Sequence, residues 1–128
     1  MQSLLLPIPI QVRLYDLPSM FAGKVHAVLC RSWKSRVKGR DFYDFIWFAG
    51  MNVTCNLSHL KERMVQSGHL EAGAALDRSK LLEMLRARLD SVDLKQAAHD
   101  VSGFITDKQA LELWSPAFFN SVAEQMAT

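Results

Sequence analysis

Four charged residues between positions 24 and 44 have the types and spacing of a phosphate-handling site. Lys24 and Arg31 are seven residues apart, so on a helix they would lie two turns apart on nearly the same face. Asp41 and Asp44 are three residues apart and would also share a helical face. A lysine on a rigid helix can donate to a triphosphate, and the carboxylates can orient a hydroxyl or contact a metal ion. We therefore take Lys24, Asp41 and Asp44 as candidate catalytic residues.

The same side chains also have a purely structural interpretation. A lysine can extend its charged end from an amphipathic helix into solvent. Two carboxylates one turn apart can stabilise the start of a helix and pair with Lys24, Arg31 or Arg40. Both interpretations can hold together, because ion-pair networks and catalytic sites use the same groups.

The segment between these two pairs is dense in positive charge and also contains Trp33. Arginine can fork onto phosphate oxygens, and an indole offers a stacking surface to a base. The segment is therefore a candidate site for phosphate or an RNA backbone. The alternative is a solvated loop, since the net charge of the whole chain is only +2. Its five cations are Arg31, Lys34, Arg36, Lys38 and Arg40.

The order of residues across this region resembles a known family. The chain reads Cys30-Arg-Ser-Trp-Lys, then the basic segment, then Lys38-Gly-Arg-Asp-Phe-Tyr-Asp-Phe. This order resembles the C-terminal half of the bacterial nucleotidyltransferases named after the AbiEii/AbiGii abortive-infection toxins. The resemblance continues through Val92-Asp-Leu-Lys-Gln-Ala-Ala, Phe104-Ile-Thr-Asp and Trp114-Ser-Pro-Ala-Phe-Phe.

The resemblance implies transfer of a nucleotide from a nucleoside triphosphate to an acceptor such as tRNA, with Mg²⁺, by a toxin that has an antitoxin partner. Such transferases hold their metal ions with a Gly-Ser pair followed by Asp-x-Asp. This chain has neither, and Asp90-Ser-Val-Asp93 has the wrong spacing.

The expected function is therefore a stand-alone or truncated C-terminal domain that binds nucleotide, RNA or a partner chain and is not catalytic alone. One alternative is an enzyme that becomes active when a separate N-terminal half completes it. Another is a non-enzymatic helical module for protein interaction.

Length and composition are those of an ordinary globular domain. The chain has 128 residues, of which 49% are hydrophobic and 22% charged, enough to bury a core without disulfides or metal staples. The apolar run from Leu4 to Ile10 is short, is interrupted by two prolines and has no basic residue before it, so it predicts neither a signal peptide nor a membrane span. A cytoplasmic protein with free thiols is expected.

No metal site is expected from the histidines and cysteines. We interpret them as scattered along the chain, without a grouping that has the spacing of metal ligands. These residues are His26, His59, His69, His99, Cys30 and Cys55.

Residues 15–128 are expected to form an all-α domain, a compact bundle of six or seven helices. Apolar residues recur at helical spacing, most clearly over 78–91, which we expect to be the central packing element. Trp47 and Trp114 are expected on helices and in the core, and the short helix that Thr106 begins is expected to run to Trp114. Expected helix caps are Asp16, Asn56, Asp93, Thr106 and Ser115.

Residues 1–14 are expected to form an extended arm or strand. Apolar side chains alternate there with Pro9, Gln11 and Arg13, and the proline restricts the strand to a sheet edge. No later segment offers a partner strand, so we expect the arm to pair with another chain, either a separate N-terminal half or a second copy in a homodimer. The side chains of this edge are Ile8, Ile10, Val12 and Leu14.

Overall fold

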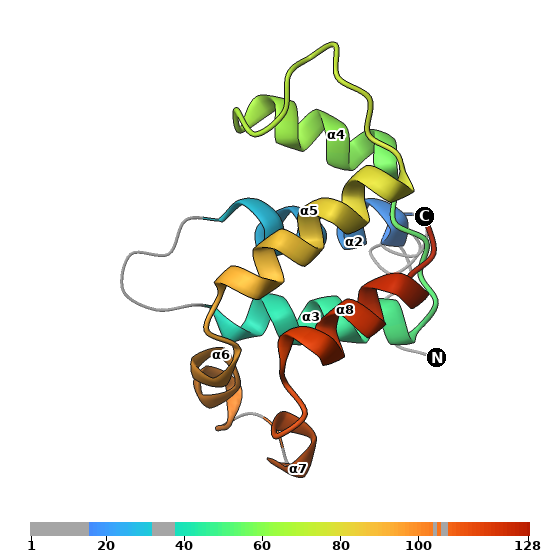
Figure 1. Cartoon of the computed structure of the whole chain (residues 1–128). Helices are drawn as coiled ribbons and strands as arrows, with labels where there is room; N and C mark the ends of the chain where they lie inside the picture. Colours follow the sequence, from blue (N-terminus) through green and yellow to red (C-terminus); the bar gives the residue numbers. More distant parts are fainter. Residues whose placement is uncertain (1–15, 32–37, 104, 106–107) are drawn as a thin grey trace.

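Seven helices make up the described part of the chain, which is residues 16–31, 38–103, 105 and 108–128 of a computed structural model (Figure 1). They confirm the prediction of an all-α bundle. The predicted arm over residues 1–14 lies outside the described residues. The helices are α2 (Leu17–Cys30), α3 (Gly39–Gly50), α4 (Leu57–Gln66), α5 (Arg78–Ser91), α6 (Leu94–Val101), α7 (Lys108–Leu111) and α8 (Pro116–Gln125).

Short polar side chains begin four of these helices. Each accepts a hydrogen bond from the backbone N–H three residues later, which typically stabilises a helix by about 1 kcal/mol. Asp16 precedes α2, but its side chain makes no capping bond, contrary to expectation. The predicted cap Thr106 lies outside the described residues, and α7 ends at Leu111 rather than near Trp114. The four caps are Asn56, Asp77, Asp93 and Ser115, with N···O distances of 3.1, 2.8, 3.0 and 3.1 Å.

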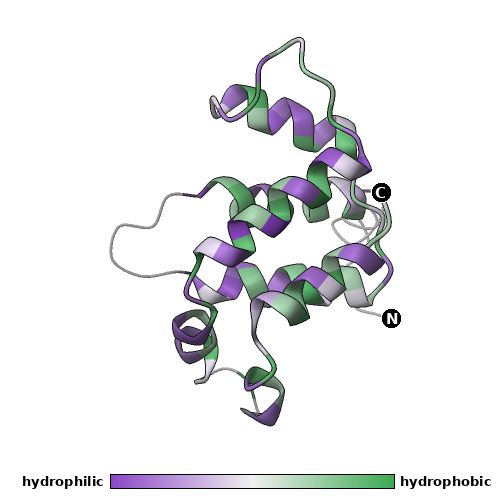
Figure 2. Cartoon of the chain, viewed as in Figure 1, coloured by the Kyte–Doolittle hydropathy of each residue, from purple (hydrophilic) through white to green (hydrophobic). Residues whose placement is uncertain are grey.

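The core forms where α2, α3, α5 and α8 pack together (Figure 1). Phe21 of α2 stacks on Phe48 of α3 with ring centroids 5.5 Å apart, and Phe42 meets Phe119 of α8 edge-on at 5.6 Å. Hydrophobic and hydrophilic residues alternate along the helices, as amphipathic packing requires (Figure 2). The prediction of an amphipathic helix over 78–91 is confirmed, because Leu81, Leu85 and Leu89 of α5 are fully buried. The prediction that it is the central packing element is wrong, because α2 and α3 each pack closely against three other helices and α5 against two.

The start of α3 lies directly against the backbone of α6. A Cβ atom on Gly39 would come within 2.0 Å of the carbonyl oxygen of Ala97, so only glycine fits this approach. The backbone N–H of Gly39 also donates to Asp100 Oδ2 at 3.0 Å. This contact fixes the position of the first turn of α3. It therefore also fixes the positions of Asp41 and Asp44 on that helix.

Two arginines of α5 bind the carboxyl ends of other helices. Arg88 donates from Nε to the carbonyl of Val28 at 3.0 Å and from Nη2 to that of Arg31 at 2.5 Å, at the end of α2. Arg78 donates to the carbonyl of Glu124 at 2.5 Å and to that of Met126, at the end of α8. These bonds satisfy carbonyls that have no partner within their own helix.

One of the two tryptophan predictions is wrong. Trp114 is buried, as predicted, although it follows α7 instead of lying within a helix. Trp47 is 49% exposed and shares an outer stripe of α3 with Tyr43 and Met51, which are 37% and 60% exposed. Helix α3 is apolar on most of its circumference, so one face cannot bury all of its large side chains. None of the helices in the described ranges is long and apolar enough to cross a membrane.

Candidate functional site

Ion pairs connect the predicted site residues of α2 and α3. Lys24 Nζ lies 2.8 Å from Asp44 Oδ2, and Arg31 Nη1 lies 3.0 Å from Asp41 Oδ2. Arg40, one turn before Asp44, adds a third contact from its Nε to Asp44 Oδ1 at 3.4 Å. The structure therefore brings Lys24, Arg31, Arg40, Asp41 and Asp44 together.

Asp41 is the buried member of this group. Its side chain is 7% exposed, against 48% for Arg31, and it lies in the first turn of α3, where the positive end of the helix stabilises a carboxylate. Its Oδ2 is close enough to Arg31 for charge attraction, but no group is placed to form a well-directed hydrogen bond with it. Buried carboxylate oxygens usually have such a bond. Asp41 Oδ2 is thus able to accept one more hydrogen bond.

A cleft of about 630 Å³ opens between α2, α3 and α4, beside these ion pairs. Its volume falls in the range of ligand pockets, about 300–1,000 Å³. Lys24, Arg31 and Asp41 line the cleft, whereas Asp44 only pairs with Lys24 at its edge. The remaining lining residues are Asp16, Ser19, Met20, Gly23, Ala27, His59 and Arg63.

Two of the lining residues, His59 and Arg63, were not recognised in the sequence as site residues. They lie one turn apart on α4, a helix whose sequence shows only an ordinary amphipathic pattern. Arg63 approaches α2 at Gly23, which has no side chain. A Cβ atom built on Gly23 would lie 4.0 Å from Arg63 Nη1. The sequence does not distinguish a cleft-lining arginine from a solvent-exposed arginine, because Arg63 reaches the cleft only through the packing of α4 against α2.

The predicted phosphate-binding residues are only partly within the described structure. Lys38 and Arg40 are exposed at the start of α3. Lys34 and Arg36 lie outside the described residues. Neither Lys38 nor Arg40 lines the cleft, so of the five predicted cations only Arg31 does so in the part of the chain described.

A comparison with protein-family models places this sequence in a known family. The model described as "Nucleotidyl transferase AbiEii toxin, Type IV TA system" matches residues 1–123. The chain belongs to this AbiEii family. The match extends over almost all of its length and does not single out the C-terminal half of the family. Membership in a toxin–antitoxin family implies an antitoxin partner. Comparisons with curated proteins and with solved structures gave no match.

The two aspartates do not fit the Mg²⁺ that resemblance to AbiEii transferases implies. Mg²⁺ is bound through carboxylates that face it together with water and phosphate oxygens. Here both oxygens of Asp44 face cations, Lys24 and Arg40, and Asp41 Oδ2 faces Arg31. A magnesium ion would have to displace these partners. The group is suited instead to holding cations in place for an anionic ligand.

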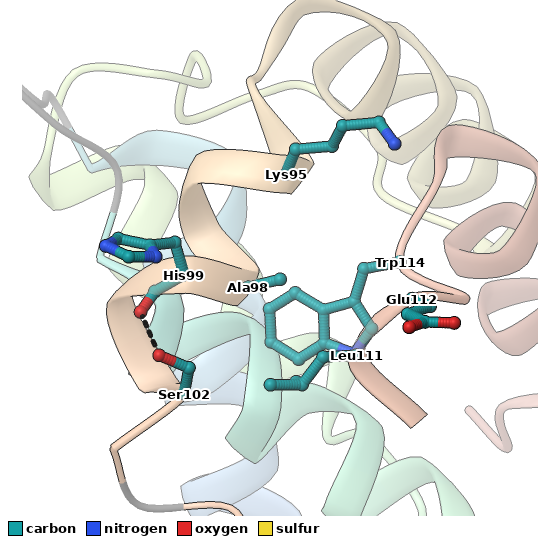
Figure 3. A pocket seen from close by; sticks show the side chains of 7 residues that line it. All are labelled: Lys95, Ala98, His99, Ser102, Leu111, Glu112 and Trp114. Atoms are coloured by element: carbon teal, nitrogen blue, oxygen red, sulfur yellow. Dashed lines mark hydrogen bonds between the residues drawn. The ribbon is translucent and has the colours of Figure 1, made fainter. Parts of the chain in front are cut away.

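A second, smaller hollow in this AbiEii protein lies between α6 and the segment around α7 (Figure 3). The indole of Trp114 and the side chains of Ala98 and Leu111 form its floor, and Lys95 and His99 stand at its rim. Its volume is about 240 Å³, below the usual range for ligand pockets. None of the predicted site residues lines it.

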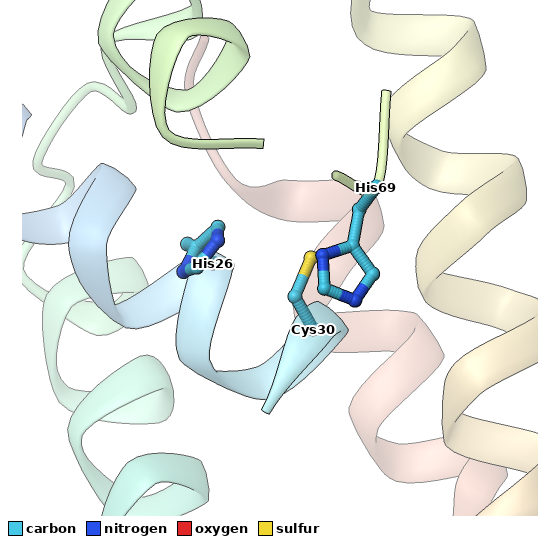
Figure 4. Close-up of side chains that lie close together, drawn as sticks. All are labelled: His26, Cys30 and His69. Atoms are coloured by element: carbon cyan, nitrogen blue, oxygen red, sulfur yellow. The ribbon is translucent and has the colours of Figure 1, made fainter. Parts of the chain in front are cut away.

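The interpretation of the histidines and cysteines as scattered is wrong for three of them. His26 and Cys30 are one turn apart on α2, and His69 of the α4–α5 connection lies beside them (Figure 4). Burial chiefly lowers the pKa of His26, and the charges of Arg63 and His69 lower it further. Burial raises the pKa of the Cys30 thiol, an effect that nearby Arg88 opposes. The His26–Cys30 spacing was the available signal, because four residues make one helical turn.

Proposed function

We propose that the cleft between α2, α3 and α4 binds the phosphate groups of a nucleoside triphosphate in an AbiEii-type nucleotidyltransferase. The observation that carries this proposal is the convergence of three cations, Lys24, Arg31 and Arg63, on one ligand-sized cleft. Residues 15–128 would then act as one phosphate-binding domain.

The ion pairs support this proposal because they fix the cations before a ligand arrives. Asp44 holds Lys24 and Asp41 holds Arg31, so less side-chain entropy is lost when phosphate binds. A lysine supplies a point charge and an arginine a two-pronged donor, and phosphate accepts from both.

We further propose that these residues are not sufficient for nucleotidyl transfer. The sequence contains no Asp-x-Asp after a Gly-Ser pair, and the aspartates of the cleft face cations. Phosphoryl-type transfer depends on metal ions that bridge the phosphates. Transfer would then require a further polypeptide segment that carries the metal-binding motif, while Lys24, Asp41 and Asp44 position the nucleotide and its acceptor.

Calorimetric titration of the chain with ATP tests the binding step. Lys24→Ala and Arg63→Ala are expected to weaken binding about tenfold each, since a charge-assisted hydrogen bond contributes about 1.5–3 kcal/mol. Lys61→Ala is the matched control, because Lys61 is on the same helix as Arg63 but lines a different hollow. Binding that is absent, or equally weakened by Lys61→Ala, would contradict the proposal.

The proposal of insufficiency has its own assay. The chain is incubated with labelled nucleoside triphosphates, Mg²⁺ and total tRNA, and no labelled RNA is expected. Addition of a polypeptide with the Gly-Ser and Asp-x-Asp motifs should restore labelling. Labelling by the chain alone that disappears in Asp41→Ala would show that Asp41 is catalytic and that no second polypeptide is needed.

A second candidate function is a protein-interaction module. The observation that favours it is the exposed stripe of Tyr43, Trp47 and Met51 along α3. Aromatic residues and methionine are enriched at protein interfaces. If a second copy of the chain covers this stripe, light scattering should report a dimer that Trp47→Ser converts to a monomer. An unchanged molecular mass in that variant would count against this alternative.

A further inference from the structure

Three side chains with metal-ligand atoms meet beside the cleft, although none of them is among its lining residues. His26 and Cys30 come from α2, and His69 comes from the segment that follows α4 (Figure 4). One imidazole nitrogen of each histidine and the Cys30 Sγ all lie within 4.8 Å of one another. Two segments about forty residues apart in sequence therefore converge on one point.

Both imidazoles contact the same serine hydroxyl, and their rings are nearly perpendicular with centroids 6.4 Å apart. Ser67 Oγ lies 3.0 Å from His26 Nε2 and 2.7 Å from His69 Nδ1. Ser67 in turn donates to the carbonyl of Met64 at 3.2 Å, at the end of α4. Ser67 therefore keeps the two imidazoles close together, and its hydroxyl must release the ring nitrogens that it contacts before those nitrogens can bind a metal ion.

We propose that His26, Cys30 and His69 form a binding site for a borderline divalent metal ion of the zinc class. Imidazole nitrogen and thiolate sulfur are the ligands that Zn²⁺ prefers, and three protein ligands with one open position are a common zinc arrangement. On binding, the thiol proton leaves to solvent and the sulfur bonds to the metal ion, and each histidine bonds through a ring nitrogen that carries no proton. His69 is exposed, so a water molecule can take the fourth position.

The distances are compatible with this site after small side-chain rotations. Zn–N bonds of about 2.0–2.1 Å and a Zn–S bond of about 2.3 Å place tetrahedral ligand atoms roughly 3.3–3.6 Å apart. The ligand atoms must therefore approach one another by about 1 Å. The exposed His69 can supply most of this movement, while His26 and Cys30 stay on their helix.

The neighbouring charges define which ions the site would select. No carboxylate belongs to the group, so hard ions such as Mg²⁺ and Ca²⁺, which require oxygen ligands, are not expected to bind. Three arginines are close by: Arg31 pairs with Asp41, Arg88 donates to backbone carbonyls, and Arg63 lines the cleft. A bound metal would connect α2 to the α4–α5 connection.

Cobalt substitution of the full chain tests this site. After treatment with a chelator, addition of Co²⁺ is expected to produce the visible bands of tetrahedral cobalt and a thiolate-to-cobalt charge-transfer band, both removed by Zn²⁺. Cys30→Ser should abolish the charge-transfer band, and His69→Ala should weaken cobalt binding by at least about tenfold. His99→Ala, an exposed histidine of α6, is the matched control and should bind as the wild type does.

Thermal unfolding supplies a second measurement. Zn²⁺ should raise the Tm of the wild type and of His99→Ala but not that of Cys30→Ser, because a ligand stabilises only a fold that binds it. Circular dichroism establishes that each variant is helical. The proposal is overturned if the folded wild type gives no thiolate band with Co²⁺, or if the band survives in Cys30→Ser.

Discussion

The guanidinium of Arg31 lies 3.0 Å from the carboxylate of Asp41, and the aspartate is buried while the arginine is half exposed. This asymmetry predicts which partner is more costly to remove. Arg31→Ala leaves a buried carboxylate unpaired and should lower the free energy of unfolding by about 1–3 kcal/mol. Lys24→Ala should cost only about 0–1 kcal/mol, because the Lys24–Asp44 pair is more open to solvent.

Urea unfolding of these variants and of the double variant Arg31→Ala/Asp41→Ala measures the difference. The double variant should recover part of the loss, since it removes the buried charge as well. If Arg31→Ala lowers the free energy of unfolding no more than Lys24→Ala does, Arg31 does not stabilise the buried carboxylate of Asp41.

Gly39→Ala should disrupt the contact between α3 and α6. Its new Cβ would lie 2.0 Å from the Ala97 carbonyl oxygen, and backbone atoms cannot move aside without shifting a helix. We expect a loss near the upper end of the 1–3 kcal/mol range that overpacking typically costs. Gly50→Ala, at the other end of α3, meets nothing within 4 Å and should be neutral or slightly stabilising. Thermal unfolding of the two variants measures this difference. Equal Tm values would contradict the close contact between Gly39 and the Ala97 carbonyl.

The basic segment is predicted to bind tRNA in a salt-dependent manner. Each phosphate contact releases condensed counterions, so affinity should fall steeply between two salt concentrations. Arg36→Ala with Lys38→Ala should weaken binding and reduce the slope of log affinity against log salt by about 1–2. Lys80→Ala with Arg86→Ala removes two exposed cations from α5 and is the control. Binding that does not change with salt concentration would favour the alternative that the basic segment is a solvated loop and does not contact phosphates.

Cys55 makes stability depend on pH in alkaline solution. Burial raises the pKa of its thiol from 9.0 to about 12. The thiol therefore ionises first in the unfolded chain, so its stabilising contribution is complete below pH 9.0 and is lost as the pH rises toward 12. Between about pH 8 and about pH 10 this loss is about 1.4 kcal/mol.

Urea unfolding of the wild type and of Cys55→Ala at those two pH values measures this contribution. The variant should lose about 1.4 kcal/mol less than the wild type over the interval. Parallel losses in the two proteins would mean that Cys55 ionises as easily in the folded state as in the unfolded state.

The arm expected over residues 1–14 lies outside the described residues, and its apolar side chains Ile8, Ile10, Val12 and Leu14 are predicted to pair with a second copy of the chain. Burial of four such side chains per copy, at about 1.5–3 kcal/mol each, is enough to offset the usual cost of association. Light scattering should then give the mass of a dimer, and Ile10→Lys should shift it toward a monomer with its helices intact. Leu113→Lys, an exposed apolar position, should remain dimeric. A monomeric wild type at high micromolar concentration would exclude this dimer.

The helices were predictable because their signals are local. Periodic apolar residues located α5 at its observed bounds, and Asn56, Asp93 and Ser115 marked helix starts correctly. Trp47 was misplaced because apolar character alone does not decide which side of α3 meets the core.

The candidate site was predictable only where its residues are close in sequence. Spacing within α2 and α3 indicated Lys24, Arg31 and the two aspartates, and the structure pairs them. Arg63 and His69 reach α2 from α4 and from the segment after it, and only the packing of α4 against α2 brings them there. Single-sequence patterns carry no information about such approaches.

The two arginines of α5 have a consequence for how the chain could be divided. Arg88 reaches back to the end of α2, and Arg78 reaches forward to the end of α8. A cut in the α4–α5 connection would leave α2 in one fragment without its arginine cap and without the core face supplied by α5. Neither fragment should fold by itself, yet the two should reassemble into a helical complex when mixed. The two fragments would then form a complementation pair. The helix content of α5 would rise only when the second fragment binds the first.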